Sequence, residues 1–134
     1  MTRRDDGRGS ASVELAILAP LVGLLLGAVV LVGRVQLARA DVEGAARSAA
    51  RDLSLSRDSH AAVEATRASL VSALDVGAPT CRTLSFVPEI SPTRVVVTLT
   101  CTVDLREAAL LPVPGSMSVS ASAVEIIDTH REGR

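Results

Sequence analysis

The sequence predicts an α+β protein with a long N-terminal helix that begins in a membrane, a second amphipathic helix, and a small three-stranded antiparallel β-sheet. Three observations carry this prediction. An uncharged apolar run fills residues 15–32, apolar residues then recur about every 3.6 positions as far as residue 74, and strict apolar–polar alternation follows from residue 93. The first pattern is typical of a membrane span, the second of helices and the third of a half-buried strand.

The apolar run from Leu15 to Val32 holds 18 residues and no charge. As a helix it is about 27 Å long, close to the roughly 30 Å of a bilayer's hydrocarbon core. A cleaved signal peptide is the main alternative, because LARA, residues 37–40, has the small-x-small ending of a signal peptidase site. A spanning helix is favoured because the run is long for a signal peptide and Arg34 and Arg39 separate it from that site. Arginines on both sides of the run leave its orientation undecided by charge.

Two helices are expected around a break at residues 56–59. The long N-terminal helix continues to about residue 57, with a narrow buried stripe formed by Val35, Ala38, Val42, Ala45, Ala46, Ala49 and Leu53. Asp58 or Ser59 can cap a second helix that runs to about Leu74, where Gly77 and Pro79 favour a stop. The expected buried face of this second helix is Val63, Leu70, Val71 and Leu74.

Three strands are expected in the last third of the chain. They cover residues 80–87, 93–105 and 116–125, and the serines of the third form its solvent-facing side. Residues 88–92 (PEISP) are expected to form the hairpin loop between the first two strands. The small sheet has little aromatic area to bury, because Phe86 is the only aromatic residue of the chain.

Cys81 and Cys101 are the two cysteines of the chain. A hairpin centred on Ser91 without a bulge would place them directly opposite each other, close enough for a disulfide. Such a bond indicates that this part of the chain lies outside the cytoplasm. The alternative is a pair of buried free thiols. A zinc site is not expected, since there is no CxxC and no histidine near either cysteine.

Composition and motifs argue against several classes of function. The net charge of −1, from 14 arginines and 15 acidic residues, gives no overall attraction for nucleic acid. His60 and His130 have no catalytic or metal partner by spacing, and no glycine-rich phosphate loop is present. We therefore expect neither an enzyme nor a protein that binds a cofactor, a metal or a small-molecule substrate.

Small residues at Ala19, Gly23 and Gly27 lie four positions apart in the apolar run. This spacing places them on one face of a helix, where a second helix could approach closely in the membrane. Glu14 stands just before the apolar run. If its carboxylate lies at the depth of the lipid headgroups, it needs no particular role. If the carboxylate lies within the hydrocarbon, its burial costs free energy.

The stretch from Gly9 to Pro20 resembles the processing signal of type IV pilins, in which a charged leader and a glycine precede a glutamate and an apolar helix. More narrowly, the chain resembles the TadE-like family, which comprises type IVb minor pilins or pseudopilins of the tight-adherence (Flp) pilus system. The resemblance covers residues 8 to about 50, and more loosely 113–125. It implies cleavage by a prepilin peptidase after Gly9, which makes Ser10 the new N-terminus, and it implies a role in assembly for Glu14.

Together with the leader that the resemblance implies (residues 1–9), the residue patterns predict a long helix (10–57) with its span at 15–32, an extracytoplasmic α+β module (58–127) and a flexible tail (128–134). The expected protein is a structural minor pilin-like subunit in the cell membrane, with its N-terminus in the cytoplasm. The expected partners are the prepilin peptidase, other pilin-like subunits and the inner-membrane assembly platform of the pilus. The alternative is an unprocessed single-pass protein whose exterior module binds or senses a ligand.

Overall fold

The computed structural model describes residues 8–78, 80–108 and 114–127, with side chains from residue 12 onward except those of residues 107 and 108. The elements are α1 (Arg8–Leu55), α2 (Ser59–Ala73), β1 (Thr83–Ile90), β2 (Arg94–Asp104), α3 (Leu105–Ala108) and β3 (Ser116–Ile126). The expected α+β fold is confirmed, with a long helix, a shorter helix and one three-stranded antiparallel sheet. The expected tail and most of the expected leader lie outside the described residues.

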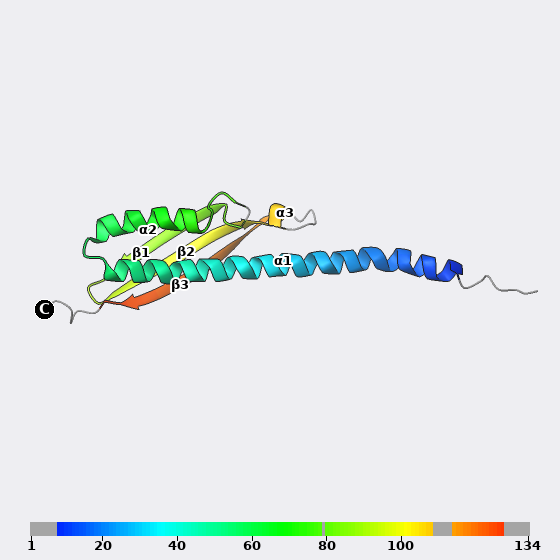
Figure 1. Ribbon diagram of the computed structural model, residues 1–134, viewed down its shortest axis with the longest axis horizontal. Helices are drawn as coiled ribbons and strands as arrows, with labels where there is room; N and C mark the ends of the chain where they lie inside the picture. Colours follow the sequence, from blue (N-terminus) through cyan, green and yellow to red (C-terminus); the bar gives the residue numbers. More distant parts are fainter. Residues whose placement is uncertain (1–7, 79, 109–113, 128–134) are drawn as a thin grey trace, which may run out of the picture.

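The molecule has two layers over part of its length and a single bare helix over the rest (Figure 1). The C-terminal half of α1 packs against β2 and β3, while α2 packs against α1 and β1. The N-terminal half of α1 extends beyond the sheet (Figure 1). The helix is continuous through Pro20.

The buried stripe of α1 is rich in alanine, whose small side chain lets the helix lie close to the sheet. Its buried members are Ala38, Val42, Ala46, Ala49, Ala50 and Leu53. The predicted stripe is confirmed at five of these positions. Ala50, which is fully buried, was not part of the prediction.

The break between the two helices is where the sequence predicts it. Oδ1 of Asp58 accepts hydrogen bonds from the backbone N–H groups of His60 (3.1 Å) and Ala61 (3.2 Å), which identifies Asp58 as the N-cap of α2. At the other end of α2, the left-handed residue is Asp75 (φ 47°), two residues before the expected Gly77. The N–H groups of Asp75 and Val76 bond back to the carbonyls of Ser72 and Val71, the pattern of a Schellman motif.

The buried face of α2 differs from the expected one. Leu70 and Leu74 are buried as predicted, but Val71 is 46% exposed and Thr66 is buried in its place. Thr66 and Leu70 are one turn apart, so they lie on the same line of the helix surface, whereas Val71 lies about 100° further round. The side that meets α1 and β1 is therefore narrower than the apolar residues of the sequence suggest.

The predicted loop at residues 88–92 is wrong, because β1 continues through Pro88 to Ile90. The turn lies later, where the N–H of Ser91 donates to the carbonyl of Arg94 (2.9 Å). Backbone groups alternate in direction along a strand, so the N–H and C=O of residues 91, 89 and 87 point to β2 and those of 90, 88 and 86 point away. The missing N–H of Pro88 thus falls on the free edge of β1, where a proline removes no hydrogen bond of the sheet.

The two faces of the sheet are sharply different. On the inner face, Val95, Val97, Leu99, Cys101 and Val103 of β2 are all buried against the helices, as the alternation predicts. The outer face carries hydroxyl groups that bond across the strands. Thr83 donates to Thr102 (3.0 Å), Thr98 donates to Ser122 (3.3 Å), and Thr100 and Ser120 lie 3.0 Å apart. The serines of β3 are exposed, as expected.

Candidate functional site

The segment expected to enter the membrane is a bare apolar helix in the structure. Large side chains such as Leu15 (71%), Leu25 (65%) and Val29 (62%) are widely exposed. Within the described residues, α1 is the one helix that is long and apolar enough to cross a membrane. A continuous apolar surface of this size on a protein marks a membrane or protein interaction site.

Glu14 lies on this exposed part of α1, between Val13 (62% exposed) and Leu15. The two ion pairs found among the described side chains are Glu43–Arg47 (3.5 Å) and Arg82–Asp104 (3.3 Å), so neither involves Glu14. A carboxylate in an apolar helical surface is costly in lipid unless a cation neutralises it. The structure thus places Glu14 where a partner from outside the described residues can reach it.

Gly9 and Ser10, the predicted processing site, lie in the first turn of α1, and their side chains are outside the described set. Ser10 and Glu14 are four positions apart in one continuous helix. This spacing places position 10 and the Glu14 side chain on the same helix face, one turn apart. An amine created at Ser10 would therefore stand near a carboxylate on the same chain or, across a helix contact, on a neighbouring one.

Ala19, Gly23 and Gly27 fall on one face of α1 by their spacing, as expected. Ala19 and Gly23 are exposed, Gly27 is buried, and a Cβ built on Gly23 would meet nothing within 4 Å. No described part of this chain therefore occupies the face at Gly23, and another helix has room to approach there.

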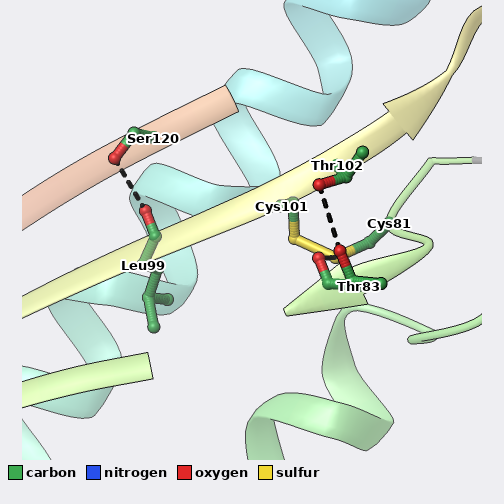
Figure 2. The surroundings of a disulfide bond; sticks show 6 residues. All are labelled: Cys81, Thr83, Leu99, Cys101, Thr102 and Ser120. Carbon is green, nitrogen blue, oxygen red and sulfur yellow. Dashed lines mark hydrogen bonds between the residues drawn. A yellow bond between two sulfur atoms is a disulfide. The ribbon is translucent and has the colours of Figure 1, made fainter. Parts of the chain in front are cut away.

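The disulfide between Cys81 and Cys101 is present, with both residues nearly inaccessible to solvent, at 2% and 0%. The expected geometry is wrong, however: Cys101 lies opposite Leu84, and Cys81 precedes β1 by two residues. The segment before β1 is held to β2 by a hydrogen bond from the N–H of Arg82 to the carbonyl of Thr102 (2.7 Å), which keeps Cys81 beside the strand. The bond thus fastens the α2–β1 connection to the central strand (Figure 2).

Figure 2 shows hydrogen bonds on the sheet around this disulfide. The hydroxyl of Thr83 donates to that of Thr102 (3.0 Å), and the hydroxyl of Ser120 donates to the carbonyl of Leu99 (3.1 Å). These contacts join β1, β2 and β3 beside the S–S bond. They help to hold the three strands together at this end of the sheet.

The described part of the chain contains no candidate metal site, because no three His, Cys, Asp or Glu side chains lie together there. A small cavity of about 130 Å³ is lined partly by Asp41, Asp75 and Cys81, between α1 and the end of α2. The sulfur of Cys81 in its wall is already bonded to Cys101. The two features of the site that stand out among the described residues are therefore the exposed apolar part of α1 and the buried disulfide.

Sequence reasoning missed two contacts. Leu31, inside the predicted span, packs against the core of the module, and Arg67 of α2 lies over the ring of Phe86. The apolar run gave no signal for the first, because periodicity does not distinguish a lipid-facing leucine from one that meets protein. The second joins residues of different elements and could not be read from spacing.

Comparison with known families supports the expected resemblance over the N-terminal part of the chain. A family model described as TadE-like protein matches residues 9–51. The matched residues run from the predicted processing site through the span and into the part of α1 that packs on the sheet. No curated protein and no solved structure matches the chain.

Proposed function

The chain carries a TadE-like segment over residues 9–51, and from it we propose that the protein is a minor pilin-like subunit of a tight-adherence pilus. In this proposal the prepilin peptidase cleaves after Gly9, α1 anchors the subunit in the inner membrane, and the module around the sheet lies outside the cytoplasm. The observation that carries the proposal is the match of residues 9–51 to the TadE-like family model, because these residues form a helix whose N-terminal half is exposed and apolar and bears Glu14 near its start.

Glu14 gives the assembly step a physical basis. Cleavage creates an α-amino group at Ser10, and such groups have a pKa near 8, so the amine is largely cationic at neutral pH. In a low-dielectric environment an ammonium and a carboxylate attract strongly, and either charge alone is penalised. Glu14 therefore favours a subunit whose carboxylate meets an amine, its own or that of a neighbouring subunit, over one left alone in lipid.

The module is suited to an oxidising compartment. A buried disulfide holds the connection before β1 to the central strand of a sheet whose core has one aromatic residue. Disulfides of this structural kind persist outside the cytoplasm. This supports an exterior location for the module and an N-terminus on the cytoplasmic side.

The continuity of α1 argues against a secreted form cut after Ala40. Such cleavage would sever α1 inside the packed region, because Ala38 on one side of the cut and Val42 on the other are both buried in the core. A cut after Gly9 falls in the first turn and removes no residue of the core.

The N-terminal residue of the mature protein tests the processing step. Mass spectrometry of the protein from its native host should find Ser10 first in cells with the prepilin peptidase and Met1 or Thr2 first in cells without it. The variant Gly9→Val should leave the leader attached, while Gly7→Val, two residues earlier, should not. An intact leader in cells with active peptidase would disprove processing and leave a tethered exterior module.

The role of Glu14 is tested separately. Glu14→Ala and Glu14→Gln should reduce incorporation into the pilus with little change in membrane level, and Glu14→Asp should retain more of it. A neighbouring substitution, Ser12→Ala, is the matched control. Wild-type incorporation of Glu14→Ala would show that the carboxylate has no part in assembly.

A further inference from the structure

The module sits directly on the end of the apolar helix, with no linker between them. Leu31, in the last turn of the uncharged run, is partly buried against the core of the module, and Ala38, two turns later, is 3% exposed. If α1 spans a bilayer as proposed, the hydrocarbon core ends close to Leu31, and the module begins at the same level.

One end of the module faces the span. α3 lies beside α1 near the beginning of its packed part and contacts it, whereas the β1–β2 turn and the start of α2 lie at the opposite end (Figure 1). The α3 end is closed by a hydrogen bond from the N–H of Leu105 to the carbonyl of Gly115 (3.1 Å), which places the start of β3 there as well. From Val32 to Leu55 the helix rises by about 35 Å, so the far end lies well clear of the membrane.

Two arginines, Arg34 and Arg106, belong to the α3 end of the module. Arg34 follows the apolar run by two residues, Arg106 lies in α3, and both are exposed. Neither belongs to an ion pair found among the described side chains. Among the described side chains, the carboxylate nearest to Arg106 in sequence is that of Asp104, which already accepts from Arg82 (3.3 Å) and from the backbone N–H of Arg106 (2.9 Å).

Guanidinium groups bind phosphate oxygens through paired hydrogen bonds, and a bilayer surface presents phosphates at the depth where this end lies. Glu107 follows Arg106 in the sequence and lowers the net charge. The attraction therefore rests on direct contact with phosphate and not on a broad positive field.

We propose that the α3 end of the module rests on the membrane surface, where Arg34 and Arg106 bind the phosphate groups of anionic lipid headgroups. This inference rests on the proposed anchoring of α1 in the membrane. Because α3 lies to one side of α1, the contact also fixes the rotation of the helix and hence the direction in which Gly23 faces.

The full chain in vesicles of phosphatidylcholine and phosphatidylglycerol tests the proposal. Both native cysteines are buried in the disulfide, so a single added cysteine can carry a fluorophore. Ser116→Cys labels the α3 end and Thr93→Cys labels the far turn. A lipid with a nitroxide on its headgroup should quench the label at residue 116 strongly and the label at residue 93 little. Equal quenching at the two positions would overturn the proposal.

Removing the two guanidinium groups tests the chemistry. In the Ser116→Cys background, Arg34→Gln and Arg106→Gln together should weaken quenching in vesicles that contain phosphatidylglycerol. We expect the ratio of docked to undocked modules to fall about fivefold for each arginine. Arg94→Gln, at the far turn, is the matched control and should change nothing. Quenching unchanged by the double substitution would also overturn the proposal.

Two further arms separate the possible explanations. Wild-type quenching that survives added inorganic phosphate identifies the lipid surface as the partner, while its loss at millimolar phosphate would show a site for the free anion and contradict the proposal. Flotation of the same vesicles reports anchoring. A chain that does not float refutes the membrane anchor itself, whereas one that floats without preferential quenching at residue 116 refutes only the docking.

Discussion

The guanidinium carbon of Arg67 lies 5.3 Å from the centre of the Phe86 ring, so α2 is joined to β1 by a cation–π contact with the only aromatic side chain of the protein. Phe86 is 6% exposed, while Arg67 is exposed to solvent. The buried face of α2 itself is narrow, formed by Thr66 and Leu70. The cation–π contact therefore adds to the free energy with which α2 packs against β1.

Phe86→Ala should lower the free energy of unfolding by about 3–5 kcal/mol, and Phe86→Leu by about 1 kcal/mol, because leucine refills most of the cavity. Arg67→Ala should cost about 0.5–1 kcal/mol in the wild type. In the Phe86→Leu background it should cost almost nothing. Pulse proteolysis of the detergent-solubilised chain in urea measures all four variants. Equal costs of Arg67→Ala in both backgrounds would show that the ring and the guanidinium are not coupled.

The disulfide closes a loop with a sequence separation of 20 residues. Replacing both cysteines by alanine should lower the free energy of unfolding by about 3 kcal/mol, chiefly because the unfolded chain gains freedom. Replacing both avoids leaving one buried thiol free. The same proteolysis experiment measures the change. An unfolding midpoint equal to that of the wild type would contradict this role for the bond.

The close approach of α1 to the sheet depends on alanine. Ala50 is fully buried and Ala40 is exposed on the same helix. Ala50→Leu should therefore destabilise the module by about 1–3 kcal/mol through overpacking, while Ala40→Leu should change its stability by less than about 0.5 kcal/mol. Urea midpoints of the two variants give the comparison. Similar midpoints would mean that the helix can move away from the sheet without cost.

Asp58 caps α2 through two backbone N–H groups. Asp58→Ala should cost about 1 kcal/mol, and Asp58→Asn clearly less, since its side-chain carbonyl can still accept these bonds. Hydrogen exchange of the His60 and Ala61 amides provides a local readout. We expect faster exchange in Asp58→Ala than in Asp58→Asn, and no difference between the two would argue against the cap.

The direction of the backbone groups in β1 makes a paired prediction. Val87→Pro removes an N–H directed at β2 and should cost about 1–3 kcal/mol, because a carbonyl of the ladder is left unpaired. The natural proline one residue later lies on the free edge and has no such cost. Val87→Ala is the control for loss of the side chain. A Val87→Pro variant as stable as Val87→Ala would show that the register has been assigned wrongly.

The sequence by itself determined the features that depend on local periodicity. The uncharged run predicts the bare helix, the recurrence of Ala38, Val42 and Leu53 predicts the face of α1 that is buried, and the alternation from Val95 to Val103 predicts the inner face of β2. Asp58 is also predictable, because a cap is satisfied within its own turn. In each case the physical signal lies between residues that are neighbours in the chain.

Only the tertiary structure decided the features that depend on contacts between elements distant in the chain. Pro88 suggests a loop until the strand order places β1 at an edge, where its missing N–H costs nothing. The pairing of Cys81 with Cys101 was foreseen, but not that Cys81 precedes the strand. Nor could spacing show that Leu31 meets the module. Strand register and contacts between elements arise when segments that are distant in the chain pack together. The spacing of apolar residues in the sequence is the same whether lipid or protein covers them.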